Sequence, residues 1–445
     1  MTVAGSFAHR SRLPSGLRSL QVRDFRLLMG ATVMQFLVMP MHLITLTFWA
    51  IDTYSDTGVL FSGLIVSVRG LGMLGFGLIG GAFADRFERR NVLRCTELSM
   101  FVLTALLACT VLFEPLGGAT IVGVLFFVFL TAATMAVDTP ARTASIPVIV
   151  PPADMGNAIG LNNIAQQITF PIVLPVVGAL NSVLGPEKVL LLSLGAWAVI
   201  LPLVFALRYS SRGAAPRRAS GGIVRDIRQG LAYARRDSTI LAVIAMIAVM
   251  QVVGMPGVGM LGPVWMTEVL DLSRSQFGFI ASLWGLGAVV SSFTFAALAR
   301  LTRRPLTLAV LVLVFAAGAI VFGHSRLIPL TAVSNFCLGF AMAGTLVTSI
   351  SVVQYTVSDE MRGRVMGLFP LVMGLSMLNV LPVSAAGQLF GLEVVVPIMG
   401  WATLAIAGFI TLSSPALRGG GSGGAHRTED EPTALPAEQA PARIA

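Results

Sequence analysis

The sequence predicts an all-α membrane protein with twelve transmembrane helices in two pseudo-symmetric six-helix bundles and with both termini in the cytoplasm. Of its 445 residues, 55% are hydrophobic and only 11% are charged, and the mean hydropathy is +0.84. So few charges cannot cover the surfaces of soluble domains, and such high hydrophobicity excludes disorder except locally. Two further observations support the prediction: the number of long apolar segments and the placement of arginine.

A helix that crosses a bilayer needs about 20 mainly apolar residues. Such segments occur twelve times, at residues 27–50, 59–83, 92–113, 117–137, 157–183, 188–208, 239–266, 276–299, 306–323, 328–353, 365–390 and 394–414. We therefore expect a cytoplasmic N-terminal segment at 1–26, an N-terminal bundle at 27–208, a central loop at 209–238, a C-terminal bundle at 239–414 and a disordered tail at 415–445. The polar, arginine-rich residues 1–26 do not resemble a cleaved signal.

Arginine orients these segments. Of the 30 basic residues, 26 fall in the two termini and in the loops expected on the same side, whereas Lys188, Arg274 and Arg326 fall in the opposite loops. Basic residues collect in cytoplasmic loops, so both termini are expected in the cytoplasm, with the chain in the plasma (inner) membrane. We therefore attribute the net charge of +9 to the basic residues that set the membrane topology. No nucleic acid is expected as a partner.

The two halves of the chain resemble each other. The first predicted helix ends in Trp49-x-x-Asp52 and the seventh in Trp265-x-x-Glu268, 216 residues later. The loops at 81–93 and 296–308 also correspond. Two parallel halves with a binding site between them near the membrane midplane are typical of secondary transporters.

One loop carries a motif. The segment Gly81-Ala-Phe-Ala-Asp85-Arg86-Phe-Glu88-Arg89-Arg90 resembles the loop between helices two and three of the major facilitator superfamily, although position 88 is Glu where that pattern has Gly. Residues 139–163 and 358–368 resemble the branch that contains the enterobactin exporter and related efflux proteins. The resemblance implies transport by alternating access, and that branch favours export with proton antiport. Helix five departs from the antiporter pattern because Leu174, not glycine, precedes Pro175.

The resemblance also implies a conformational latch on the cytoplasmic side. Its residues are Gly81, Asp85, Arg86, Arg89, Arg90 and Asp138. Asp85 would contact the positive N-terminus of helix eleven when the inner side is closed. Arg89 and Arg90 would pair with Asp138 at the inner end of helix four. The alternative is that these arginines only set the topology.

Arg69 is the one charge deep in a predicted span. Placing arginine there costs about 2.5–3.5 kcal/mol, so we expect its side chain to face the protein interior. It would either bind an anionic or carbonyl group of the substrate or act as an electrostatic partner in the transport cycle. Alternatively, neighbouring backbone carbonyls satisfy it. Further candidates for substrate binding are the amides Gln35, Asn163, Gln166, Gln167, Gln251 and Asn379, which could equally join helices. Trp284 is a candidate for an apolar wall of the binding site, with simple packing as the alternative.

Proton antiport needs a titratable group that is reached from both sides in turn. The candidates are Asp52, Glu268 and Glu97, with Asp85 as a further possibility. Neither a metal nor another cofactor is expected. Cys95, Cys109 and Cys337 lack metal or redox spacing and are expected to be buried thiols.

The predicted function is secondary active export of a small organic molecule, such as a drug-like compound, a siderophore or another natural product, in exchange for protons. The alternative is an importer or uniporter of the same fold for a small metabolite. An enzyme is not expected, because no catalytic dyad is visible at membrane depth, and a sensor without transport is disfavoured by the motif loop. ATP-driven transport is disfavoured because the chain has no Gly-x-x-x-x-Gly-Lys-Ser/Thr loop. The expected partners are the substrate, protons and the lipid bilayer, and the protein is expected to be a monomer.

Overall fold

The computed structural model describes residues 15–114, 117–210 and 223–418, and every regular element in these ranges is a helix. Eleven helices there are long and apolar enough to cross a membrane. A twelfth span results if the bent pair Arg225–Arg236 and Ser238–Gly254, which meet at 114°, counts as one. The predicted all-helical membrane architecture is therefore confirmed.

The N-terminal bundle contains six long helices, preceded by a short 3₁₀ helix at Ser15–Gln21. They are α1 (Arg23–Thr53), α2 (Gly58–Arg86), α3 (Arg89–Phe113), α4 (Thr120–Ile149), α5 (Met155–Leu184) and α6 (Pro186–Phe205). Gly185, at a φ of 81°, makes the tight turn between α5 and α6, and Pro186 then begins α6 with a backbone angle already suited to a helix.

The spans of the C-terminal bundle are more often divided into shorter helical segments. Its first span runs through α8 (Ser238–Ala248), the π-helical segments Val249–Gly254 and Pro256–Met260, α9 (Gly262–Val264) and a π-helical end at Trp265–Val269. The others are α10 (Arg274–Ala297) with α11 (Ala299–Thr302), α12 (Pro305–His324), α13 (Ile328–Thr356), the consecutive α14 (Asp359–Met366), α15 (Leu368–Leu378) and α16 (Val380–Phe390), and α17 (Leu392–Ser413).

Two helices include residues that lie outside the predicted apolar segments. Helix four was expected to end at residue 137, but α4 continues to Ile149 through Pro140 and Pro147. Asp138 and Arg142, which lie beyond that limit, are paired inside the bundle. The predicted central loop contains α7 (Ile223–Arg236), which packs on α14: a Cβ at Gly230 would lie 2.6 Å from the Arg364 carbonyl oxygen, and Asp226 pairs with Arg364 at 3.4 Å.

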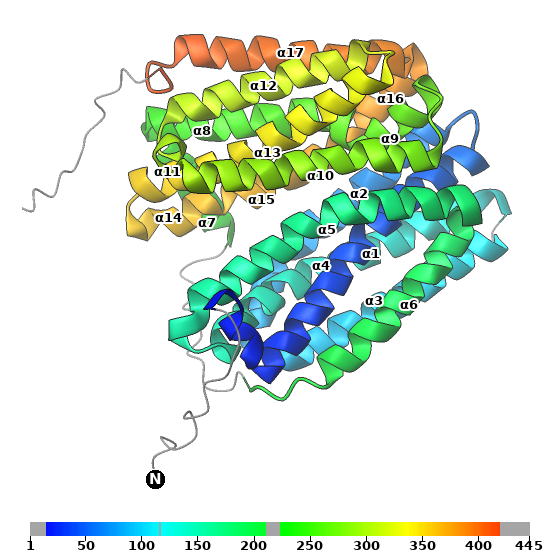
Figure 1. Cartoon of the computed structure of the whole chain (residues 1–445), viewed down its shortest axis with the longest axis horizontal. Helices are drawn as coiled ribbons and strands as arrows, with labels where there is room; N and C mark the ends of the chain where they lie inside the picture. Colours follow the sequence, from blue (N-terminus) through cyan, green and yellow to red (C-terminus); the bar gives the residue numbers. More distant parts are fainter. Residues whose placement is uncertain (1–14, 115–116, 211–222, 419–445) are drawn as a thin grey trace, which may run out of the picture.

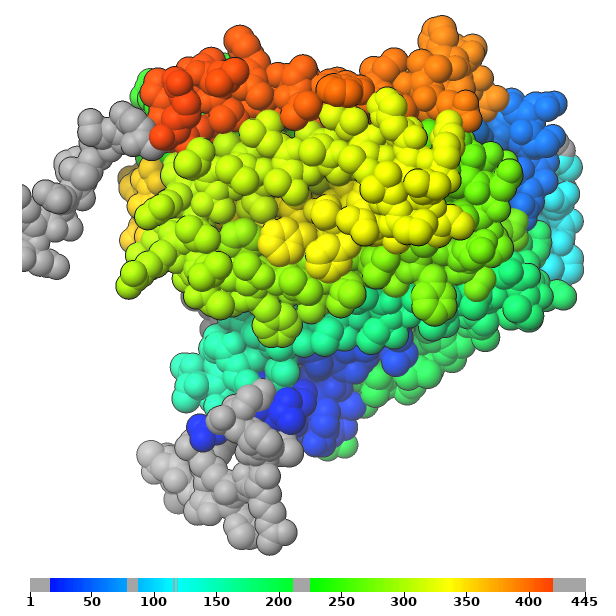
Figure 2. Space-filling model, turned by 45° about the horizontal axis from the view of Figure 1, so that its top comes forward, coloured from blue at the N-terminus to red at the C-terminus, as the bar shows by residue number. Residues whose placement is uncertain are grey.

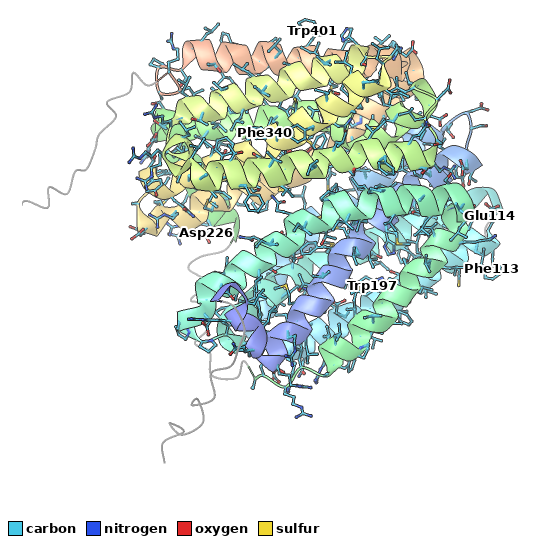
Figure 3. The ribbon with its side chains drawn as sticks, viewed as in Figure 1. Phe113, Glu114, Trp197, Asp226, Phe340 and Trp401 are labelled. Carbon is cyan, nitrogen blue, oxygen red and sulfur yellow. The ribbon has the colours of Figure 1, made fainter. Side chains whose placement is uncertain are left out.

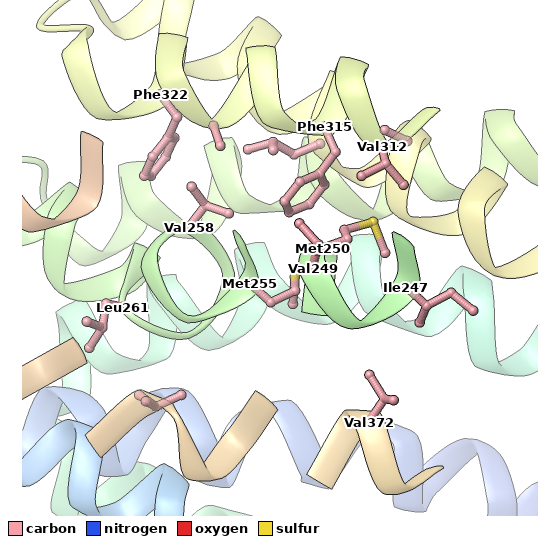
Figure 4. Packing of buried hydrophobic residues seen from close by; sticks show 14 of the residues in the cluster. Ile247, Val249, Met250, Met255, Val258, Leu261, Val312, Phe315, Phe322 and Val372 are labelled. Atoms are coloured by element: carbon pink, nitrogen blue, oxygen red, sulfur yellow. The ribbon is translucent and has the colours of Figure 1, made fainter. Parts of the chain in front are cut away.

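Close packing holds each bundle together. In the C-terminal bundle, Phe315 and Phe322 of α12 are fully buried against the π-helical segments, where Met250 and Val258 lie (Figure 4). Because lipid is as apolar as these side chains, such packing stabilises the bundle through van der Waals contact.

The outer surface of the bundles carries large apolar side chains, as expected of a surface that faces lipid. Phe279, Phe293 and Phe409 are each 70% exposed. Cys95 and Cys109 are also exposed, so the prediction that they are buried is wrong for these two thiols. In a membrane helix an apolar residue can face lipid instead of a protein core.

The two bundles lie side by side and are inclined to each other. Figure 1 shows them converging near the loop between α1 and α2 and diverging toward α7, α14 and the start of α5. We call the diverging side, which carries Arg94 and Arg303, the arginine-rich side, and the converging side the arginine-poor side.

Candidate functional site

A seam between the two bundles is formed mainly by α5 against α10 and by α2 against α15 and α16. In the space-filling view, α5 (teal) lies directly against α10 (yellow-green) (Figure 2). Glycine allows this approach: a Cβ at Gly178 would lie 2.3 Å from the Arg274 carbonyl oxygen, and one at Gly278 would lie 2.5 Å from that of Leu174. A side chain at either position would therefore push the helices apart.

The same seam continues between α2 and the eleventh span. A Cβ at Gly63 would overlap the Ser384 hydroxyl, and one at Gly70 would lie 2.6 Å from the Met377 Cβ. Ser67 donates a 3.0 Å hydrogen bond to the Met377 carbonyl. The two bundles are thus joined through small residues, as is common between membrane helices.

Arg274 holds the arginine-poor end of the seam. Its guanidinium pairs with Asp52 at the end of α1, donates a 3.3 Å hydrogen bond to the Asn181 carbonyl of α5, and lies over the Phe48 ring at 5.0 Å. Nearby, Gln388 of α16 donates to the Asp56 carbonyl. Asp52, predicted to carry a proton, is therefore half of an ion pair between the bundles in this conformation.

Toward the arginine-rich side the seam loosens. Gln167 of α5 still donates a 3.0 Å hydrogen bond to the Ser292 hydroxyl of α10. Beyond it, a Cβ at Gly160 or Gly156 would meet no other atom within 4 Å, and the same holds for Gly75 and Gly77 of α2. If the arginine-rich side is cytoplasmic, as the sequence predicts, this is an inward-facing conformation.

A second polar feature lies inside the N-terminal bundle and joins α1, α3 and α4. Arg142 of α4 donates from Nε to Asp138 at 3.1 Å and from Nη1 to the Thr32 hydroxyl at 3.1 Å, and its Nη2 pairs with Glu97. Both carboxylates are fully buried. We call Glu97, Asp138 and Arg142 the charged cluster.

Asp138 is fully engaged in this charged cluster. Besides Arg142, it accepts hydrogen bonds from the Thr96 hydroxyl at 2.7 Å and from the Gln35 amide at 3.1 Å. Glu97 differs, because its Oε2 is buried and has no hydrogen-bond partner among the described residues. With both carboxylates ionised, the cluster holds two negative charges and one positive charge.

The predicted partners of Asp138 require correction. The sequence resemblance paired it with Arg89 and Arg90, but here its ionic partner is Arg142. Arg89 donates to the Ala144 carbonyl at 2.8 Å, and Arg90 donates to the Arg208 carbonyl and pairs with Glu88. The side chains of Asp85 and Arg86 and the surroundings of Gly81 lie outside what the structure describes.

Arg69 lies in the N-terminal bundle and not in the seam. Its side chain is 7% exposed, and its Nη2 approaches the Met135 sulfur at 3.5 Å. The structure shows no ion pair for it and no bond to a backbone carbonyl in the ranges that it describes. It lines a cavity of about 20 Å³ whose walls come from α1, α2, α3, α4 and α6. The full lining is Gln35, Val38, Met39, His42, Arg69, Met100, Thr131, Met135 and Trp197.

The asparagine and glutamine residues predicted to bind substrate do not lie together in one site. Asn163 and Gln166 are exposed on α5, and Gln167 bridges the bundles. The Gln35 amide donates a hydrogen bond to Asp138 of the charged cluster. The Asn379 amide donates to the Val252 carbonyl at 2.7 Å, so it joins α15 to the π-helical segment.

The remaining candidates lie in the C-terminal bundle. The side-chain oxygen of Gln251 is buried without a hydrogen-bond partner in the described ranges. The Trp284 ring packs edge-on against Phe315 at 6.4 Å. Glu268, a predicted proton carrier, is exposed near the arginine-poor end.

Two arginines at these sites were not predicted as functional residues. Arg142 follows Asp138 by four residues, a spacing that places both on one helix face and that was visible in the sequence. No sequence pattern indicated Arg274, because its partner Asp52 is 222 residues away along the chain. Groups of three or more potential metal ligands are absent from the described residues.

The comparisons with known proteins agree with this architecture. The chain is 21% identical over 325 residues to macrolide efflux protein A of Enterococcus faecalis, covering 71% of this chain and 98% of that one. A point mutant of the nucleoside transporter NupG superposes with a TM-score of 0.71 at 12% identity, covering 87% of this chain and 99% of the other.

A second solved structure is similar in fold. A bacterial homologue of the human lysosomal transporter Spinster, in an inward-facing and unoccupied conformation, gives a TM-score of 0.66 at 14% identity over 92% of this chain and 97% of its own. The sequence profile of the Major Facilitator Superfamily matches residues 28–380. This chain is therefore a member of the Major Facilitator Superfamily, a family of membrane transporters and not of enzymes.

Proposed function

We propose that this transporter exports a small organic molecule across the plasma (inner) membrane by alternating access in exchange for protons. The observation that carries the proposal is the charged cluster, in which one arginine serves two fully buried carboxylates. The similarity to a macrolide efflux protein supports export and a drug-like substrate such as a macrolide, with siderophores and other natural products as further candidates. Membership of the enterobactin-exporter-like branch remains a prediction.

The charge count supports proton coupling. A buried carboxylate without its own counter-ion is costly, and protonation removes the cost. Asp138 has three hydrogen-bond donors, whereas Glu97 has an oxygen without a partner in the described ranges. Glu97 is therefore the group in the cluster that takes up the proton.

Substrate would enter the seam from the arginine-rich side. Asn163 and Gln166 are exposed on α5 together with Ile164 and Phe170, which are 51% and 44% exposed. Amides among apolar side chains suit an amphipathic organic molecule. The latch around Asp85, Arg89 and Arg90 would close this side once substrate has passed.

Transport in everted membrane vesicles tests this proposal. We expect macrolides or siderophores to dissipate an imposed proton gradient in wild-type vesicles. Glu97→Gln should bind substrate yet no longer couple its movement to protons, because the amide cannot release one. Its purified form should release no proton when substrate binds, whereas the wild type should release about one.

Glu393→Gln is the matched control, because Glu393 is a 63% exposed carboxylate on the arginine-poor side. It should retain coupled transport. Proton-coupled transport by Glu97→Gln at the wild-type rate would contradict the role of Glu97. Substrate accumulation in the opposite direction would contradict export and favour the importer.

A further inference from the structure

The cavity beside Arg69 contains donors that lack acceptors. Arg69 Nε and Trp197 Nε1 are both buried and have no hydrogen-bond partner among the residues described. Trp197 is 2% exposed and lies inside the N-terminal bundle (Figure 3). A buried guanidinium without a counter-ion is costly, and a compensating group in the cavity would remove this cost.

The other hydrogen-bond donors of the lining already have partners. Thr131 donates to the Phe127 carbonyl at 2.8 Å, and His42 Nε2 is hydrogen-bonded to the Ser193 hydroxyl at 2.8 Å. The Gln35 amide donates to Asp138. None of the nine lining residues is a carboxylate. Asp138 is occupied by Gln35, Thr96 and Arg142 and has no ion pair with Arg69 in the described ranges.

We propose that this cavity binds a single monovalent anion of halide size. Its volume of about 20 Å³ admits one occupant of roughly this size. A water molecule would accept the two free N–H groups but would leave the guanidinium without a counter-charge. An anion satisfies the donors and the charge together. All nine lining residues belong to helices of the N-terminal bundle, so the site lies within one bundle.

Halide titration of the purified full-length protein tests the site. Chloride or bromide replaces gluconate at constant ionic strength, and the unfolding temperature is recorded. Because a ligand that binds only the folded state stabilises it, we expect a saturable rise. Crystals grown with bromide should show anomalous scattering between the Arg69 guanidinium and the Trp197 indole.

Trp197→Phe keeps the aromatic ring and removes one donor to the ion. The half-saturating halide concentration should rise about tenfold, as expected for one hydrogen bond to a charged group. Trp401→Phe is the matched control, because Trp401 is 53% exposed on the outer face of α17 (Figure 3). Arg69→Met should abolish the halide effect, and Arg300→Met, which removes an exposed charge, should retain it.

Three results would overturn the proposal: wild-type stability that does not depend on halide, a cavity without bromide scattering, or equal effects of Trp197→Phe and Trp401→Phe. If Arg69→Met does not fold, the bromide signal and the comparison of Trp197→Phe with Trp401→Phe still test whether the anion binds. None of these measurements depends on transport, so they stand whether or not the chain is an exporter.

Discussion

Arg142 is the residue on which the buried charges of the N-terminal bundle depend. Replacing it with methionine leaves Glu97 and Asp138 without their counter-ion. Breaking a buried ion pair by removing one partner costs about 3–5 kcal/mol. We therefore expect Arg142→Met to lower the free energy of unfolding in detergent by about this amount, measured by denaturant or thermal unfolding.

Two further variants separate charge from packing. Arg300→Met, at an exposed position, should change the unfolding free energy by less than about 0.5 kcal/mol. The triple variant with Arg142→Met, Glu97→Gln and Asp138→Asn should regain much of the lost stability, because no unpaired charge remains buried. Wild-type stability of Arg142→Met alone would mean that the carboxylates do not need the arginine.

At the residue scale, the sequence predicted which side chains are unusual better than it predicted their partners. Arg69 is conspicuous because charge at membrane depth is costly, and Glu97 and Asp138 are acidic candidates for proton coupling and for the latch. Apart from Arg142, which lies on the same helix as Asp138, their neighbours come from other helices. Hydropathy does not determine how helices rotate against each other. Arg69 was therefore expected at a substrate site, yet it lines a cavity within one bundle.

At the scale of elements, the contact between α5 and α10 depends on glycine. A Cβ at Gly178 would lie 2.3 Å from one backbone atom of α10 and 2.9 Å from another. Gly178→Val should therefore force the arginine-poor ends apart and deplete the conformation described here. Spin labels on cysteines replacing Lys188 and Leu389, one in each bundle, should report a longer distance between these ends.

Gly195→Val is the control for this change, because a Cβ at Gly195 of α6 meets no atom within 4 Å. It should leave the label distance unaltered. An unchanged distance in Gly178→Val, with the protein folded, would show that α5 and α10 can separate locally without moving the bundles.

The elements themselves followed well from hydropathy, with two instructive exceptions. α4 extends to Ile149 because Asp138 and Arg142 satisfy each other, so a polar residue did not mark the helix end. α7 lies in the predicted central loop, the arginine-rich segment between the sixth and seventh apolar segments. Its apolar residues lie on one face, a pattern that a search for uniformly apolar spans misses.

For the whole molecule, Arg274 stabilises the conformation that is closed on the arginine-poor side. Its ion pair with Asp52 and its contact with Phe48 both cross between the bundles. Partly exposed pairs and cation–π contacts contribute about 1–2 kcal/mol together, which corresponds to a roughly 5- to 30-fold change in the ratio of two states. Arg274→Met should shift the ratio by this factor toward the conformation open on that side, measured by single-molecule fluorescence between the same two label positions.

Arg326 offers a close control. It also pairs with a carboxylate, Glu393, and lies over an aromatic ring, Trp265, but both partners belong to its own bundle. Arg326→Met should leave the ratio of states unchanged. Equal shifts in Arg326→Met and Arg274→Met would mean that the loss of charge, and not of the contact between bundles, causes the effect. The sequence could not predict this contact, since it depends on how the two halves are placed.

The packing of α7 on α14 also limits how far the two halves can travel. Because Asp226 and Gly230 fasten α7 to the C-terminal bundle, the tether between the halves is only the stretch from Ser210 to Ile223. Fully stretched, this stretch spans at most about 45 Å. If the halves move relative to each other as proposed, this stretch limits their separation. Release of α7 from α14 would lengthen the connecting segment by the residues of the helix.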